Sequence, residues 1–75
     1  MKDDERRLLA ELQLRTRQAD GIENLPYVRA MVRDFGMNEN RAAYICEKWT
    51  VKGWYDYGVN VLAGWLTKKG LAVVL

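Results

Sequence analysis

Two apolar stripes separated by a glycine constrain the fold of this 75-residue chain more than any other feature. The first stripe has the i, i+3, i+4, i+7 spacing of one helix face and comprises Val28, Met31, Val32 and Phe35. The second stripe repeats that spacing and comprises Ala42, Ile45, Cys46 and Trp49. Between the stripes, Gly36 predicts the end of one helix and Asn38 predicts the N-cap of the next. A turn this short makes the two helices cross steeply.

Weaker signals complete the predicted fold. Acidic residues at the start and inward-facing leucines predict a first helix over about 4–19, which Gly21 ends. The two striped helices then cover about 25–35 and 38–52. After Gly53, aromatic residues predict strands over about 54–58 and 63–67, joined by a protruding loop. The predicted fold class is mainly α with a small β-hairpin, in a single domain over residues 1–75.

One cysteine and no histidine exclude most catalytic and metal-binding chemistry. A disulfide within the chain, a Cys/His zinc site and an imidazole general base are all ruled out. Four acids, Asp3, Asp4, Glu5 and Glu11, are expected on a solvated first helix. We therefore predict no enzyme activity, no cofactor and no metal. Cys46 is interpreted as a small buried hydrophobe.

Neither end of the sequence carries a membrane signal. The charged N-terminus, Met-Lys-Asp-Asp-Glu-Arg-Arg, is not followed by the apolar run of a signal peptide. The apolar run over residues 71–75 is too short to span a bilayer. We expect a cytoplasmic protein without membrane contact.

The net charge of +2 is spread unevenly along the chain. From Arg41 onward, the basic residues outnumber the only two acids, Glu47 and Asp56. The basic excess lies on the second striped helix and on the hairpin that follows it. This distribution suits a polyanionic partner.

The segment after the second stripe contains two short residue motifs in a fixed order. It reads Lys52-Gly53-Trp54-Tyr55 and later closes with Leu66-Thr67-Lys68-Lys69-Gly70. Together with the two stripes, this order resembles the winged helix-turn-helix DNA-binding superfamily, including its MarR-like bacterial regulators. The resemblance covers residues 28–70. It implies three helices and a wing, with the third helix in the major groove of double-stranded DNA. Such a protein acts as a small transcriptional regulator or as a phage or mobile-element DNA-binding protein.

The resemblance also implies which side chains contact DNA. On the exposed face of the third helix, Arg41 pairs with a guanine edge, Asn40 with adenine and Lys48 with a phosphate. Two arginines of the preceding helix clamp phosphates, unless they pair with Asp34 or Glu23, and two lysines lie at the base of the wing. The full predicted set is Arg29, Arg33, Asn40, Arg41, Tyr44, Lys48, Lys68 and Lys69. The alternative interpretation of all these positions is a solvated surface.

Aromatic residues concentrate in the second half of the chain. We expect Trp49, Trp54 and Trp65 to form the core between the helices and the hairpin, because a small domain needs its bulky side chains buried. Tyr55 and Tyr57 alternate with Trp54, so one of these residues is expected at the surface.

A protein-interaction module that does not bind DNA is the alternative function. It is favoured by the apolar residues of the predicted loop, Val59, Val61 and Leu62, and by the off-stripe Leu14. Leu14 and the tail over residues 71–75 also form the predicted surface of a homodimer. The tail either extends the sheet or packs on the first helix, and the sequence leaves both open.

Overall fold

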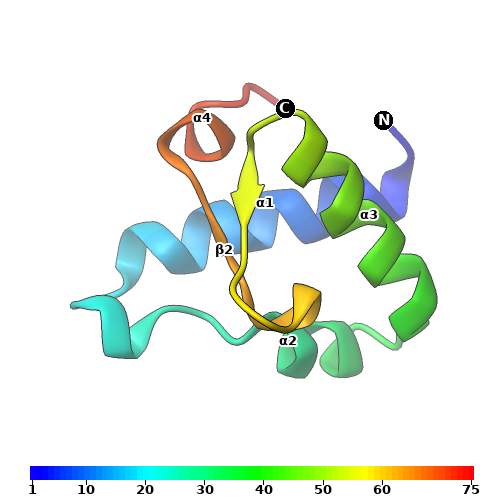
Figure 1. The fold of residues 1–75 in the computed structure, drawn as a ribbon, viewed down its shortest axis with the longest axis horizontal. Helices are drawn as coiled ribbons and strands as arrows, with labels where there is room; N and C mark the ends of the chain where they lie inside the picture. The colour runs from blue at the N-terminus through cyan, green and yellow to red at the C-terminus, as the bar shows by residue number, and fades with distance from the viewer.

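Helices make up most of the structure, and a small antiparallel sheet completes it (Figure 1). The structure is a computed structural model that describes residues 1–75. Its α-helices are α1 (Asp3–Gln18), α2 (Val28–Asp34), α3 (Glu39–Val51) and α4 (Lys68–Leu71). Its strands are β1 (Tyr55–Asp56) and β2 (Trp65–Leu66), and its 3-10 helices are η1 (Ile22–Asn24) and η2 (Val61–Ala63). The prediction of a mainly α fold with a small β-hairpin is confirmed.

Two helix ends differ from the sequence prediction. The second helix starts at Val28 rather than near residue 25, because Leu25 before the proline and Tyr27 after it are both extended. The first helix ends at Gln18, and the following Ala19 is already extended. Gly21 therefore does not end α1; its positive φ of 98° instead begins η1.

The turn between α2 and α3 forms as the sequence predicts. Gly36 has a φ of 67°, and a Cβ added there would meet nothing within 4 Å. The backbone conformation alone therefore favours glycine at this position. Asn38 is the N-cap of α3, and its Oδ1 accepts from the backbone N–H groups of Asn40 at 2.8 Å and Arg41 at 3.1 Å.

The core lies where α1, α2, α3 and the hairpin meet. The predicted burial of Leu12, Cys46 and Trp49 is confirmed. The Trp49 ring packs edge-on against Tyr55, with 6.2 Å between ring centroids. The buried apolar cluster comprises Leu8, Leu9, Leu12, Val28, Met31, Val32, Ala42, Ile45, Cys46, Trp49, Tyr55, Leu62 and Leu66.

The register of the sheet decides which hairpin residues are inside. Tyr55 pairs with Leu66 and both are buried, whereas Asp56 pairs with Trp65 and both point outward. Trp65 is 42% exposed, so its predicted place in the core is wrong. Side chains alternate between the two faces of a strand, so the inward position of Tyr55 directs the next residue, Asp56, to the outer face. Trp65 pairs with Asp56 and therefore lies on that outer face too.

The loop between the strands folds back instead of protruding. Leu62 in η2 is only 3% exposed, and η2 packs against α2 and α3. The Tyr55 hydroxyl donates to the carbonyl of Val61 at 2.6 Å and accepts from the N–H of Gly64 at 2.9 Å. These contacts correct the prediction of an apolar, protruding loop, because only Val59 of its three apolar residues is exposed.

The C-terminal tail packs on the first helix rather than extending the sheet. The Gln13 amide in α1 donates to the carbonyls of Gly70 at 3.1 Å and Val73 at 2.9 Å. Arg17 donates to the carbonyl of Leu71. Leu14 is exposed, as predicted. None of the helices has the length and apolar character needed to cross a bilayer.

Candidate functional site

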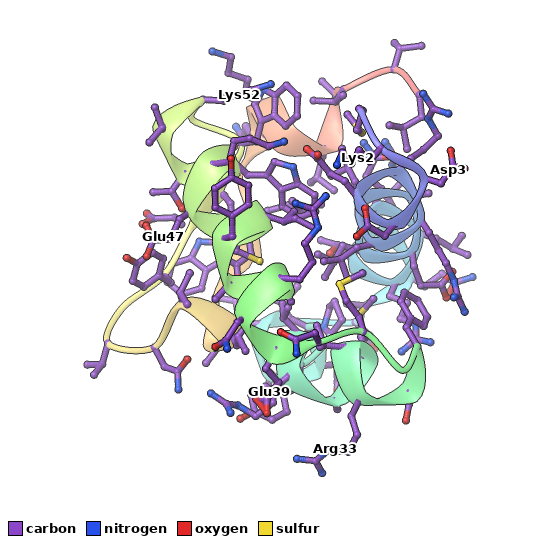
Figure 2. All side chains as sticks on the ribbon, turned by 90° about the vertical axis from the view of Figure 1, so that its right-hand side faces the viewer. Lys2, Asp3, Arg33, Glu39, Glu47 and Lys52 are labelled. Atoms are coloured by element: carbon purple, nitrogen blue, oxygen red, sulfur yellow. The ribbon has the colours of Figure 1, made fainter.

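The exposed surface of α3 is a continuous stripe along one face of the helix. It consists of Asn40, Tyr44, Glu47 and Val51, which we call the outward stripe. Tyr44 is 60% exposed at its middle. The stripe is rotated from the predicted surface, because Arg41 and Lys48 are half-buried at its edge and point toward α1. Glu47 lies on the side of α3 opposite α1 (Figure 2).

One flank of α3 is joined to the start of α1 by an arginine–carboxylate pair. Arg41 donates from Nε to Oδ2 of Asp4 at 2.9 Å and from Nη2 to Oδ1 at 3.1 Å. The hydrogen bonds from Arg41 lower the pKa of Asp4 from 3.8 to about 2, because they stabilise its charged form. The predicted base-reading arginine therefore has a fixed partner within the chain.

A buried carboxylate holds the same flank farther along α3. Glu5 is only 1% exposed, so the prediction that this acid lies on a solvated helix is wrong. Its two oxygens accept from Lys48 Nζ at 2.6 Å and from Trp49 Nε1 at 2.9 Å. Burial opposes the charge on Glu5, but the hydrogen bonds from Lys48 and Trp49 outweigh it and lower the pKa.

A shallow polar depression separates the first turn of α1 from α3. The Tyr44 ring lies beside it, with its centroid 5.7 Å from Arg41 Cζ and 6.0 Å from Lys48 Nζ. The lining residues are Met1, Lys2, Glu5, Arg41, Tyr44 and Lys48. The parts of Arg41 and Lys48 that their carboxylate partners leave uncovered therefore remain accessible from solvent.

The hairpin covers the other flank of α3. Arg29 in α2 donates from Nη1 to Glu39 at 2.5 Å and from Nη2 to Asn60 at 3.3 Å, rather than pairing with the acids considered from sequence. The Tyr57 hydroxyl donates to Glu47 at 2.7 Å, and this bond raises the pKa of Tyr57. Both acids of α3 thus have partners, and Arg29 is occupied in binding one of them.

The remaining predicted cations lie at the two ends of α3. Arg33 is exposed, makes no ion pair and projects from α2 near the start of α3 (Figure 2). Lys68 and Lys69 are exposed at the start of α4, where Lys69 lies close to Gly53 at the end of α3. Lys52, at that same end, lies 4.5 Å over the ring of Trp54.

Sequence reasoning missed the two carboxylates that hold α3. A signal for Glu5 is present, because it continues the spacing of the inward leucines Leu8, Leu9 and Leu12 by one further turn. No local signal identifies Asp4 as the partner of Arg41, which is 37 residues away in sequence.

The site offers hydrogen-bonding and charged groups but no reactive nucleophile. The single thiol, Cys46, is buried in the core, and burial raises its pKa to about 12. A thiol with such a pKa stays protonated at neutral pH and is a poor nucleophile. No protein-family model, curated protein or solved structure matches the chain.

Proposed function

We propose that the chain is a winged helix-turn-helix protein that binds double-stranded DNA through α3, as a small transcriptional regulator or a phage or mobile-element protein. The observation that carries the proposal is the outward stripe, which leaves one face of α3 exposed from Asn40 to Val51 beside Arg41. A helix exposed along one face fits the major groove, whose floor presents base edges.

The first two turns of α3 supply the base-reading groups in this proposal. Asn40 is exposed, and its amide is suited to the N6 and N7 atoms of adenine. Arg41 is in the first turn and is suited to guanine. Tyr44 lies one turn beyond Asn40 and offers a ring and a hydroxyl to the groove. The N-terminal residues of a recognition helix are the ones that contact bases in related motifs.

The unpaired cations supply the phosphate contacts. Arg33 and the pair Lys68 and Lys69 lie near opposite ends of α3, which has 13 residues. A helix of that length spans about 20 Å, since each residue adds about 1.5 Å. This span exceeds the width of the major groove, about 12 Å, so cations at both ends can meet the two backbones.

A salt-dependent titration tests the proposal. We expect the wild-type protein to bind fluorescent duplex DNA at low salt and to lose affinity steeply as salt is added, because binding releases counterions. Arg33→Ala should weaken binding to all sequences. It should also reduce the slope of log affinity against log salt concentration by about 1. Arg15→Ala, which removes the same charge from the far half of α1, is the matched control and should change both quantities less. A wild-type protein that binds no duplex at low salt would end the DNA proposal.

A protein partner is the second candidate, and one observation favours it. Ile22, Leu25 and Trp65 line a depression without a polar lining residue on the surface shared by η1 and β2. Ile22 is 84% exposed there. Clustered exposed apolar side chains are typical of association surfaces. Sedimentation at micromolar concentration tests self-association, and Ile22→Asp should abolish it if this surface is responsible. Leu14 and the tail remain the predicted homodimer surface if Ile22→Asp has no effect.

A further inference from the structure

The Asp4–Arg41 pair uses only one edge of the guanidinium group. Asp4 accepts from Nε and Nη2, which form the lateral edge of Arg41. Arginine has five N–H donors in a rigid plane, so both N–H groups of Nη1 and one of Nη2 are not used by Asp4. Two of these donors point forward from the terminal edge. The lateral contact therefore fixes the plane of the side chain and leaves its terminal edge available.

Both partners are themselves fixed at helix starts. The carboxylate of Asp4 also accepts from the backbone N–H of Glu5 at 2.7 Å, which orients it on α1. The backbone N–H of Arg41 donates to the N-cap Asn38 at 3.1 Å, which holds the first turn of α3. The guanidinium is thus positioned by two separate helices. An arginine held in this way loses less side-chain freedom when it binds a planar acceptor pair.

We propose that Asp4 is a positioning residue that aims the terminal edge of Arg41 at the O6 and N7 atoms of one guanine. This inference rests on the proposed function, because it names the base that the α3 surface would recognise. Asp4 itself contacts no DNA in this arrangement; it acts through Arg41.

Local charge favours a base edge over a phosphate as the partner of Arg41. The carboxylate of Asp4 is ionised beside the guanidinium and balances its charge, whereas Arg33, Lys68 and Lys69 have no ion pair. A phosphate gains less from a guanidinium whose charge is already balanced than from these unpaired cations. The acceptor pair of guanine is uncharged and matches the spacing of two parallel N–H groups. The Asp4–Arg41 pair therefore favours a bidentate contact of Arg41 with a base.

The test begins with the binding site that wild-type protein selects from a random duplex pool. Each guanine of that site is replaced in turn by 7-deazaguanine, which lacks only the N7 acceptor, and the affinity loss is measured by fluorescence anisotropy. The guanine that Arg41 reads is the one whose replacement weakens binding by the wild-type protein but does not weaken binding by Arg41→Ala. Asp4→Asn should reduce discrimination at this guanine by about five- to tenfold, which is the lower part of the roughly five- to 150-fold selectivity of a bidentate pair, because Arg41 itself remains.

Two variants separate positioning from charge. Asp3→Asn removes the same charge one residue away, and Asp3 makes no hydrogen bond or ion pair with Arg41, so this variant should tighten binding to all duplexes and keep the discrimination. The double variant Asp4→Asn/Arg41→Ala should discriminate no less than Arg41→Ala alone, because Asp4 has no route to the base except through Arg41.

Three results would overturn the inference while leaving DNA binding intact. In the first, Asp4→Asn changes DNA binding in the same way as Asp3→Asn. In the second, Asp4→Asn sharpens discrimination, because the carboxylate of Asp4 competes with the base for Arg41. In the third, Arg41→Ala would weaken all sequences equally, as loss of a phosphate contact does. A wild-type protein that binds no duplex would instead overturn the proposed function, and the inference with it.

Discussion

The two flanks of α3 are held by different kinds of interaction. On the α1 flank, Asp4 and Glu5 bind Arg41 and Lys48 through full charges. On the hairpin flank, the buried ring of Tyr55 packs on Trp49, its hydroxyl closes the loop, and Leu62 is buried alongside. The α1 flank is therefore held mainly by buried or half-buried charge, and the hairpin flank mainly by apolar burial, with the exposed Arg29–Glu39 pair as an addition.

The two kinds of interaction contribute differently to the direction of the basic side chains of α3 and to the stability of the fold. The Asp4–Arg41 pair joins half-exposed groups and contributes little to the free energy of unfolding, because water already solvates the separated charges. Removing buried aromatic area costs several times more. The Asp4–Arg41 pair therefore mainly fixes the direction of Arg41, whereas the hairpin flank mainly stabilises α3. The next three predictions test this division.

Trp49→Ala should have the largest effect, because Trp49 belongs to both flanks. Its side chain is fully buried, its Nε1 binds Glu5 and its ring packs on Tyr55. We expect the free energy of unfolding in urea to fall by about 3 to 5 kcal/mol. In a chain this small, that loss is enough to unfold it. Trp49→Phe is the control and should lose less. A Trp49→Ala protein that unfolds like wild type would disprove the packing of α3 described above.

Tyr55→Phe should have a smaller effect, confined to the hairpin flank. The change keeps the ring but leaves the carbonyl of Val61 and the N–H of Gly64 without their hydroxyl partner. Unsatisfied buried groups cost about 1 to 3 kcal/mol. This loss, measured by urea unfolding, should be the same at pH 5 and pH 7. A loss that appears at only one of these pH values would show that the hairpin flank depends on charge.

The smallest effects are those of pH, and they should have opposite directions on the two flanks. Asp4 and Glu5 have lowered pKa values in the folded chain, so their pairs stabilise fully above the ordinary carboxyl pKa. That contribution is lost as the pH falls from 3.8 toward about 2, the pKa of folded Asp4. Tyr57 has a raised pKa, so its bond to Glu47 contributes fully below pH 10.0 and is lost above it.

Two variants assign these pH effects to their flanks in thermal unfolding experiments. Glu5→Gln should make the unfolding temperature less dependent on pH in the acid range, because glutamine keeps an acceptor for Trp49 but carries no charge. Tyr57→Phe should have this effect only in the alkaline range. An acid profile that Glu5→Gln leaves unchanged would mean that other carboxyl groups control acid unfolding.

Local features of the fold were predictable from sequence, and contacts between distant segments were not. The stripes, the glycine turn at Gly36 and the cap at Asn38 each depend on a few neighbouring residues, so their pattern is visible in the chain. The inward position of Tyr55 and the outward position of Trp65 depend on the phase of two-residue strands, which no periodicity can establish.

The candidate site was predictable only in part, for the same reason. Asn40 and Tyr44 are exposed because the α3 stripe fixes which residues face outward. Arg41 and Lys48 lie at the edge of that face, and their direction is decided by acids on α1 that are far away in sequence. Charged side chains are flexible, so their partners follow from the tertiary arrangement and not from helix spacing.

Chemical-shift mapping tests the central claim, DNA binding by α3, most directly. Backbone amide signals of the ¹⁵N-labelled protein are followed while the selected duplex is added at low salt. We expect the largest shifts in the segment from Asn40 to Lys48 and at Arg33, with little change at Ile22, Leu25 and Trp65. Shifts confined to those three apolar residues, or no shifts at excess duplex, would contradict the account.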